Sequence, residues 1–409
     1  MTPANRKLIL ARAPSGLKKD ARRLWSPGGM ALRASGALDD ILTGLPSERD
    51  VAVVRDGAAY VMGLSPSAVL RASGPEALAA LDALREGWWA GFIAYDLGRA
   101  IESVPERNPP DPLVSDLCLV RFDEQVRVEE EAAPRRDRAR APTHVFWRSS
   151  LNREAWVDAV ERIGEHLRAG DCYQVNLTRR LHTPRRADPI ALFRELVRDN
   201  PAPHAALVRI GDVAVVSASP ERFLRLDRRR IQTRPIKGTS SDPAALLASA
   251  KDRAENVMIV DLARNDLGRI CTYGSVRVEA LCALEGHPGL CHLVSTVAGT
   301  LRADVGLGDV VRATFPPASV TGCPKPRVLE IIETLEPVRR GVYCGAVGFI
   351  DADAGVVDLN VAIRTFTITV DGTFFGVGGG IVADSEPGAE WEETELKARH
   401  LLSIARRAF

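Results

Sequence analysis

Ala362-Ile-Arg-Thr-Phe-Thr-Ile-Thr-Val370 is followed directly by Asp371-Gly372 and then by Thr373-Phe-Phe-Gly-Val377. The outer two segments are rich in the β-branched and aromatic residues that are typical of strands. Asp-Gly between two such segments favours a tight turn that joins paired strands. This stretch therefore predicts an antiparallel hairpin, with strands at 362–370 and 373–377.

Other predicted elements extend this pattern on both sides of the hairpin. Helices are predicted at Trp156–Leu167, which ends before a Gly at position 170, at 250–267 and at 390–405. Strands are predicted at Cys172–Leu177, Val213–Ser217, Arg222–Leu226 and Ala346–Ile350. The helices fall between blocks of strands rather than alternating strictly with them, which favours an α+β fold over a doubly wound parallel sheet.

A charged segment interrupts this organisation before the first helix. Glu129 to Pro142 reads EEEAAPRRDRARAP, which has almost no apolar content and predicts an exposed connection. We therefore divide the chain into an N-terminal region (1–128), a charged linker (129–147) and a larger C-terminal domain (148–409). Val51–Val54 and Trp88–Tyr95 look like buried strands of the first region.

Composition excludes several classes of function. The 409 residues are 45% hydrophobic and 26% charged with a formal charge of +1, so no field favours nucleic acid or anionic membrane. No apolar run approaches the roughly 18 residues of a membrane span, and no segment resembles an export signal. The seven cysteines form no close pair at metal-ligand spacing. We expect a cytoplasmic protein with free thiols and neither nucleic acid nor membrane as a partner.

Acidic residues share the apolar face of two predicted helices. In the helix at 250–267, Asp252 and Glu255 lie in the same sector as Ile259. Unpaired inward carboxylates cost several kcal/mol, although a helix N-terminus tolerates negative charge. A hard cation such as Mg²⁺, which prefers carboxylate oxygens and keeps part of its water shell, would satisfy them.

The helix at 390–405 repeats the pattern. Glu390, Glu393 and Lys397 lie in the sector that also holds Leu401 and Ile404, whereas Glu392, Glu395 and Arg399 face the other way. Mg²⁺ between the two helices would satisfy both pairs of acids. The alternative is that Lys397 neutralises Glu393 without a metal.

Three further features are suited to an anionic or electrophilic ligand. Lys237 is a single cation between Pro235 and Gly238, where the backbone is stiff on one side and free to turn on the other. Four glycines in Gly376–Gly380 allow backbone amides to approach a ligand closely. Arg364 has apolar neighbours and needs a planar anionic partner. Taken alone, each of these features is more often structural than functional.

The segments together, in this order, resemble the chorismate-utilising enzymes related to anthranilate synthase component I, and within them component I of the aminodeoxychorismate synthases. The matching motifs are GDCYQVNLTRR from Gly170, SPERFL from Ser219, TRPIKGT from Thr233, KDRAENVMIVDLARNDLGRIC from Lys251, HLVSTVAGTL from His292, SVTGCPKPRVLEIIETLEP from Ser319, YCGAVGF from Tyr343, AIRT from Ala362 and GGGIVADSEPGAEWEET from Gly378. They cover essentially all of residues 150–405, and the resemblance is weaker over the first 80 residues.

This resemblance implies a fold and a set of roles. The fold would be large antiparallel β-sheets forming a sandwich-like core flanked by helices. Glu255 and Glu393 would bind Mg²⁺, with Asp252 and Glu390 as near neighbours. The residues that would grip the substrate are Ser319, Tyr343, Arg364, Gly378, Gly379, Gly380 and Lys397. His292 would lie beside the substrate ring, unless it is an ordinary buried histidine, and Glu221 would protonate the departing C4 hydroxyl of chorismate.

Lys237 distinguishes members of the family. Anthranilate synthases look like PIAGT at this place, which leaves C2 of the ring open to ammonia, whereas a lysine there can attack C2 itself. Displacement of the lysine by ammonia at C4 would give 4-amino-4-deoxychorismate, the precursor of 4-aminobenzoate in folate biosynthesis. The resemblance thus implies a transferase of the transaminase class, an aminodeoxychorismate synthase. The alternatives are an anthranilate or isochorismate synthase, a non-catalytic chorismate-binding protein and a nucleotide-binding protein that uses the glycine run.

The same resemblance implies partners. No segment looks like a glutamine amidotransferase, so we expect ammonia to come from a separate amidotransferase subunit, component II, or from solution. A separate aminodeoxychorismate lyase would act on the product. The sequence departs from the family at Pro317-Ala318-Ser319, where glycines are common, and at Cys323, where alanine is frequent.

Overall fold

The predicted hairpin is present, although its first strand is shorter than expected. β19 (Thr365–Thr369) pairs antiparallel with β20 (Gly372–Ile381), and Thr369 lies opposite Gly372. The computed structural model describes residues 38, 42, 45, 49–111, 113–129, 143–287 and 290–409. Across these ranges the chain forms two ten-stranded sheets, here called sheet A and sheet B, and β19 and β20 belong to sheet A.

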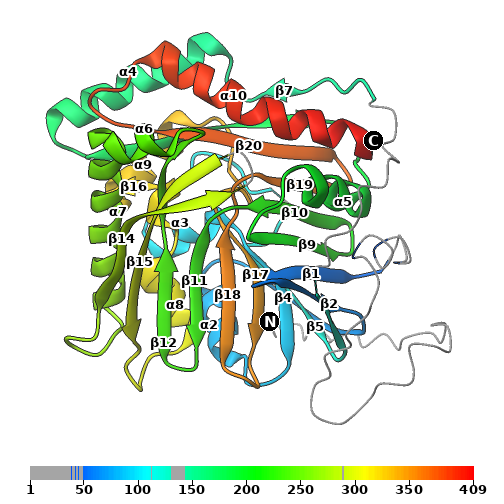
Figure 1. Cartoon of the computed structure of the whole chain (residues 1–409). Coiled ribbons are helices and arrows are strands. Elements are labelled where there is room, and N and C mark those ends of the chain that lie inside the picture. The colour runs from blue at the N-terminus through cyan, green and yellow to red at the C-terminus, as the bar shows by residue number, and fades with distance from the viewer. Residues whose placement is uncertain are drawn as a thin grey trace, which may run out of the picture.

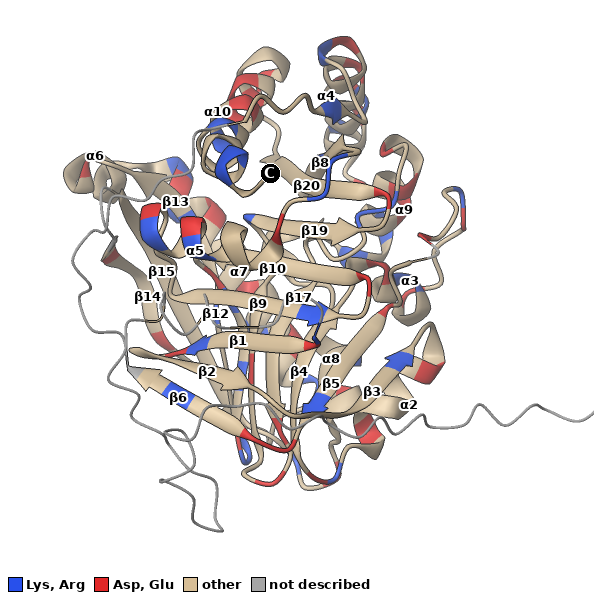
Figure 2. Ribbon diagram, turned by 90° about the vertical axis from the view of Figure 1, so that its right-hand side faces the viewer, with Lys and Arg blue, Asp and Glu red and all other residues tan. Residues whose placement is uncertain are grey.

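Sheet A runs in the order β16-β8-β20-β19-β10-β9-β1-β2-β6, with β7 paired to β8. Its remaining strands are β16 (Gly322–Cys323), β8 (Gln174–Thr183), β10 (Val213–Ser219), β9 (His204–Ile210), β1 (Val51–Asp56), β2 (Ala59–Gly63), β6 (Gln125–Glu129) and β7 (Arg148–Ser149). Figure 2 shows these strands stacked from β8 and β20 at the top to β6 at the bottom.

Sheet B runs in the order β13-β15-β12-β11-β18-β17-β4-β5-β3, with β14 paired to β15. Its strands are β13 (Ile236–Ser240), β15 (Leu290–Thr300), β12 (Arg230–Arg234), β11 (Arg222–Asp227), β18 (Val356–Val361), β17 (Ala346–Asp351), β4 (Trp88–Ile93), β5 (Leu117–Phe122), β3 (Pro66–Ala72) and β14 (Arg277–His287). Figure 1 shows this sheet from β14 and β15 on the left to β4 and β5 on the right.

The two sheets pack face to face and helices cover both outer faces. The core between them includes Val208 of sheet A and Phe92 and Phe349 of sheet B. α2 (Pro75–Ala83), α7 (Ala250–Gly268) and α8 (Leu307–Thr314) pack against sheet B. α5 (Pro189–Asp199), α10 (Pro387–Ala405), α4 (Arg153–Ala169) and α9 (Lys325–Leu335) pack against sheet A. The α+β class and the helix-flanked sandwich expected from the sequence are therefore confirmed.

Both sheets contain strands from the N-terminal region. In sheet A, β1 pairs with β9, with Ala52 opposite Val208. In sheet B, β4 pairs with β17, with Gly91 opposite Gly348. The parts predicted at 1–128 and 148–409 thus share both sheets and the core between them. Residues 130–142, most of the predicted linker, lie outside the described residues.

The chain crosses from sheet B to sheet A inside the segment that was predicted to be a single strand. β18 ends at Val361 in sheet B, and β19 begins at Thr365 in sheet A. Arg364 lies at the crossing with a φ of +51°, a conformation that non-glycine residues rarely adopt. The predicted strand 362–370 is therefore wrong at its start. Residues typical of strands continue through the crossing, so the composition gives no sign of the turn in the backbone.

The buried face of α10 also differs from the prediction. Glu390 is buried, and so are Thr394 and Ala398 one and two turns later. The side chains of Glu393 and Lys397 are 52% and 48% exposed, so they lie at the rim of the helix interface rather than inside it. Glu395, which we expected to face solvent, forms an ion pair with the buried guanidinium of Arg179.

Two other sequence expectations concern the chain as a whole. All seven cysteines are free thiols. Among the described residues, no helix is both long and apolar enough to cross a membrane.

Candidate active site

Two crossings between the sheets lie side by side and carry two of the predicted site residues. The chain passes from β10 in sheet A to β11 in sheet B through Glu221, and from β18 back to β19 through Arg364. Backbone hydrogen bonds join the crossings, because Val361 N donates to Glu221 O and Ala218 N donates to Arg364 O. The site is therefore built at the junction of the two sheets.

Lys237 is held on β13 by a local irregularity. β13 pairs with β15, and the register shifts between Lys237 and Thr239, a bulge of the kind that re-aims a side chain. Gly238 has a φ of +82°, and a Cβ at this position would lie 2.9 Å from Cβ of Asp252. A glycine is thus required for β13 to rest against α7, which carries the predicted acids.

The amine of Lys237 is buried among charges of both signs. Its Nζ lies 3.6 Å from Oε2 of Glu255, and the two side chains are 13% and 18% exposed. Burial lowers the pKa of Lys237 below its ordinary value, the nearby Glu255 opposes this shift, and Lys397 adds to it. The side chain thus has a larger neutral fraction than an exposed lysine, and a neutral amine is a nucleophile.

Glu221 is the most strongly perturbed acid near Lys237. It is only 4% exposed. Burial raises its pKa to about 7, although a hydrogen bond with Ser319, the charge of Lys237 and a backbone hydrogen bond from Ile236 act in the other direction. A carboxyl that stays partly protonated near neutral pH can donate a proton, as the sequence analysis required of it. The predicted substrate contact of Ser319 stays a prediction, because its hydroxyl bonds Glu221 here.

His292 lies on β15 next to the bulge of β13. Its Nδ1 is 2.8 Å from Oγ1 of Thr239, and the residue is 2% exposed. His292 is therefore buried and lies opposite Thr239, the residue of β13 that is two positions from Lys237. This contact is compatible with both interpretations of His292 that the sequence left open.

The acids of α10 lie close to the glycine strand. Glu390 Oε1 accepts a hydrogen bond from Ser385 Oγ at 2.6 Å, and burial raises the pKa of Glu390 despite this bond. Glu393 Oε1 lies 2.5 Å from Lys397 Nζ, which also donates to Gly378 O at 3.1 Å. Burial opposes ionisation of Glu393, but the ion pair with Lys397 outweighs it and lowers the pKa of Glu393.

The four predicted metal ligands are Glu255 and Asp252 on α7 and Glu393 and Glu390 on α10. No group of three or more His, Cys, Asp and Glu side chains is close enough to hold a metal anywhere in the described ranges. Glu393 is paired with Lys397, as the metal-free alternative required, and Glu255 is paired with Lys237, which that alternative did not include. Glu255 and Glu393 both lie near the charge of Lys237. Mg²⁺ commonly takes one or two protein carboxylates, keeps several waters and adds oxygens of the substrate, so these two acids remain candidate ligands.

Because the glycines of β20 have no side chains, Lys237 and Glu390 can both lie close to the backbone of this strand. A Cβ at Gly380 would lie 3.3 Å from Lys237 Nζ, and one at Gly379 would lie 3.2 Å from Glu390 Oε2. β19 pairs with β20 only as far as Phe375, so residues 376–381 pair with β8 along one edge alone. Residues 376–381 of β20 thus have one edge that β19 does not pair. This free edge supports the predicted close approach of the glycine backbone to a ligand.

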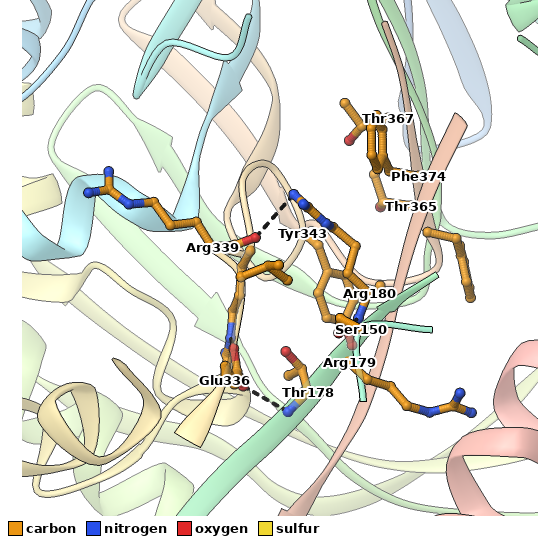
Figure 3. A pocket seen from close by; sticks show the side chains of 14 residues that line it. Ser150, Thr178, Arg179, Arg180, Glu336, Arg339, Tyr343, Thr365, Thr367 and Phe374 are labelled. Atoms are coloured by element: carbon orange, nitrogen blue, oxygen red, sulfur yellow. Dashed lines mark hydrogen bonds and ion pairs between the residues drawn. The ribbon is translucent and has the colours of Figure 1, made fainter. Parts of the chain in front are cut away.

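Tyr343 contacts β20 at Gly376, and Arg364 lies at the crossing just before β19. A Cβ at Gly376 would lie 2.1 Å from the ring of Tyr343, and burial raises the pKa of this phenol well above its ordinary value. The ring lines a small cavity with Thr178, Arg180 and Glu336 (Figure 3). The Arg364 guanidinium has no ion pair or hydrogen bond among the described residues, and burial lowers its pKa. An unpartnered guanidinium at the junction is suited to a carboxylate ligand.

Sequence reasoning missed two features of this region. Gln174, at the start of β8, is fully buried beside Gly380 and Lys237, and neither polar atom of its side chain has a hydrogen-bond partner. Glu336 and Arg340 form a buried ion pair that clamps the backbone of β8 through Thr178 N and Asn176 O. The only signal for the clamp was a four-residue spacing, which is equally typical of exposed helical pairs.

The family of this chain follows from comparison with known proteins. The sequence model of the chorismate binding enzyme family matches residues 52–403. The chain belongs to this family. The match begins within β1 and ends within α10, so the region before the predicted linker is part of it.

Named relatives of this chorismate-binding enzyme include two kinds of synthase. It is 39% identical over 347 residues to aminodeoxychorismate synthase component 1 of Escherichia coli (strain K12), which covers 78% of this chain and 76% of the relative. It is 38% identical over 361 residues to anthranilate synthase component 1 of Thermus thermophilus, which covers 79% of this chain and 78% of the relative. The family resemblance drawn from the motifs is therefore confirmed.

Solved structures share the fold. Anthranilate synthase component I from Streptococcus pneumoniae superposes with a TM-score of 0.74 at 24% identity, covering 96% of this chain and 100% of the other. The menaquinone-specific isochorismate synthase from Escherichia coli superposes with a TM-score of 0.73 at 18% identity, covering 92% of each chain. The sandwich of two sheets is thus the fold of chorismate-utilising enzymes.

Proposed function

We propose that this chorismate-binding enzyme is component I of an aminodeoxychorismate synthase, which converts chorismate and ammonia to 4-amino-4-deoxychorismate. Sequence identity does not separate this function from anthranilate synthesis, because the two kinds of relative are 39% and 38% identical to the chain. The observation that carries the proposal is the buried amine of Lys237, close to the acid Glu221 and to Glu255.

In the first half-reaction the neutral amine of Lys237 attacks C2 of the ring. The N–C2 bond forms, the two ring double bonds shift and the C4–O bond breaks. Glu221 gives its proton to the departing hydroxide, so water leaves and Glu221 becomes a carboxylate. The pKa of about 7 allows Glu221 to hold that proton near neutral pH. The adduct carries one positive charge on the lysine nitrogen.

In the second half-reaction ammonia attacks C4. The N–C4 bond forms, the double bonds shift back and the C2–N bond breaks, which releases Lys237 as a neutral amine. The product carries the positive charge as a C4 ammonium group, and Glu221 regains a proton from that group or from water. The net reaction joins chorismate and ammonia and releases one water.

The remaining site residues would hold the substrate. Arg364 provides an unpartnered guanidinium for a carboxylate, and the phenol of Tyr343 stays protonated and can donate a hydrogen bond. Backbone amides of Gly378–Gly380 and the ammonium of Lys397 would bind substrate oxygens from the β20 side. His292 would lie beside the ring.

We also propose that Glu255 and Glu393 bind Mg²⁺, with Asp252 and Glu390 supporting its water shell. Bound Mg²⁺ would hold a carboxylate of chorismate. Binding at these two glutamates would separate them from Lys237 and Lys397, which form their present ion pairs. Both lysines would then be available to the substrate.

The proposed function implies partners beyond this chain. Ammonia would be delivered by a glutamine amidotransferase subunit, in keeping with the name component 1 of the first relatives. A separate lyase would convert the product to 4-aminobenzoate for folate synthesis. The cytoplasmic location expected from the sequence stays a prediction.

Product analysis tests the proposal. The purified chain is incubated with chorismate, Mg²⁺ and an ammonium salt, an aminodeoxychorismate lyase is added, and the aminobenzoate isomer is identified. We expect 4-aminobenzoate. Mainly 2-aminobenzoate would show an anthranilate synthase instead, the alternative that the Thermus thermophilus relative represents.

A further inference from the structure

Gln174 is a buried amide beside Lys237 that has no role in the reaction proposed above. It is the first residue of β8 and lies opposite Cys323 of β16. The residue is 0% exposed, and both Oε1 and Nε2 lack a hydrogen-bond partner. A buried amide without partners costs about 1–3 kcal/mol, so such groups are rare unless a ligand or a function requires them.

The amide lies next to the nucleophile rather than in the general core. A Cβ placed on Gly380 would lie 2.7 Å from Gln174 Nε2 and 3.3 Å from Lys237 Nζ, so both nitrogens approach the same point. Side chains alternate along β8, and the apolar Val175 and Leu177 pack against α4 and α9 on the other face. Gln174 therefore points into the space between β20 and β13, where Lys237 lies.

We propose that Gln174 is a positioning residue that holds the amine of Lys237 during attack on chorismate. A neutral amine has two N–H groups and one lone pair. In the present structure Nε2 of Gln174 is the atom that faces this point, so the amide must turn to present Oε1. One N–H of the amine can then donate to Oε1, which leaves the lone pair free to point toward C2. In the present structure the amine lies 3.6 Å from Glu255 instead. The inference rests on the proposed function, because it assigns Gln174 a role in the lysine adduct.

An amide suits this role better than a carboxylate. Glu255 is anionic and stabilises the ammonium form of Lys237, which cannot attack. The amide oxygen accepts a hydrogen bond from the amine without adding negative charge. Gln174 thus provides a hydrogen-bond acceptor for the amine of Lys237 when the amine moves from Glu255 to the substrate.

The variant Gln174→Met tests this inference, since it keeps the volume and removes both polar atoms. Formation of the Lys237 adduct with chorismate, measured by rapid quench and intact mass, should slow roughly tenfold, the value of one lost hydrogen bond. The dissociation constant of chorismate should change less than about twofold, because the carboxylate contacts remain. The midpoint of thermal unfolding should rise, since an unsatisfied buried amide has been removed.

Asn360→Leu provides the matched control. Asn360 is also a buried amide, but Nδ2 donates to His204 O at 2.8 Å and Oδ1 accepts from Val347 N at 3.1 Å. Its replacement should lower the unfolding midpoint. A lower midpoint for Gln174→Met as well would show an ordinary structural amide and overturn the inference.

A double-mutant cycle separates action through Lys237 from a direct contact with substrate. In a Lys237→Ala background, Gln174→Met should have no further effect on residual turnover. An equal loss in both backgrounds would overturn the assignment. A wild-type chain that forms no adduct would contradict the proposed function, whereas a wild-type adduct that forms at an unchanged rate in Gln174→Met would contradict only the role of Gln174.

Discussion

Lys237 Nζ of β13 lies 3.6 Å from Glu255 Oε2 of α7, so the proposed nucleophile and a proposed metal ligand share one ion pair. The carboxylate of Glu255 favours the charged form of Lys237 and so opposes the effect of burial on the pKa of the lysine. Attack on chorismate requires the pair to separate. A cation on Glu255 and an acceptor for the amine, Gln174, would make that separation favourable.

Lys237→Ala removes the nucleophile and leaves Glu221 and the carboxylate contacts in place. We expect chorismate to bind nearly as before, C4 amination to fall by orders of magnitude, and residual amination to shift toward C2. The wild-type chain mixed with chorismate and no ammonia should gain mass on the peptide that contains Lys237. Near-normal C4 amination by the variant would contradict the covalent route.

Glu221→Gln should change how stability depends on pH. Because the pKa of Glu221 is about 7 in the folded chain and 4.5 ordinarily, its ionisation is disfavoured by folding, and stability is lost as pH rises from 4.5 to 7. The amide of the variant does not ionise. Between pH 5 and pH 8 the free energy of unfolding of wild type should therefore fall by up to about 3 kcal/mol more than that of the variant. Urea unfolding at the two pH values measures this. Parallel losses in both proteins would refute the assigned pKa.

Glu255→Gln and Glu393→Gln should each weaken Mg²⁺ and chorismate together, since each removes an anionic oxygen ligand. Activity is measured over an Mg²⁺ titration, and excess chelator should abolish it in wild type. Glu392→Gln is the control, because Glu392 is a neighbouring acid that is 61% exposed and paired with Arg153. Full activity in chelator would exclude the metal.

Gly380→Ala should slow turnover without unfolding the chain. The added methyl group would lie 2.7 Å from Gln174 Nε2 and 3.3 Å from Lys237 Nζ, so these side chains must move from their present positions. Gly286→Ala is the control, since a Cβ there meets nothing within 4 Å. Rates and melting temperatures of the two variants are compared with wild type. Equal rates would show that turnover does not require the close contact of Gly380 with Gln174 and Lys237.

Glu336→Gln should destabilise the fold strongly. Glu336 and Arg340 are 4% and 2% exposed, and removal of one partner of a buried ion pair costs about 3–5 kcal/mol. Glu330→Gln, which breaks the half-exposed pair with Arg327, should cost less than about 1 kcal/mol. Chemical denaturation measures both values. Equal costs would mean that the clamp on β8 contributes little.

The sequence predicted the parts of the fold that depend on local signals. The helix at 250–267 matches α7 within one residue at its end, and Gly170 ends α4 in the left-handed conformation that a C-cap requires. The Asp-Gly turn correctly indicated the β19–β20 hairpin. These features are set by residues next to one another in the chain.

The sequence did not predict features that depend on distant partners. Arg364 stands between Ile363 and Thr365, two β-branched residues typical of strands, and only the position of sheet A explains why the chain turns there. Glu393 lies at the rim of α10 because the buried stripe passes through Glu390 and Thr394 instead. Nothing in the sequence of β8 indicates that the side-chain amide of Gln174 would be buried without a hydrogen-bond partner.

The interleaving of early and late strands affects how the protein can fold during synthesis. β4 pairs with β17, and the edge of β8 pairs with β20, so both sheets remain incomplete until about the last 65 residues have left the ribosome. Contacts over such sequence separations favour slow folding. A nascent chain that stops before β17 would expose the pairing edges of β4 and β11 together, which makes translation arrest in that interval a hazard for aggregation.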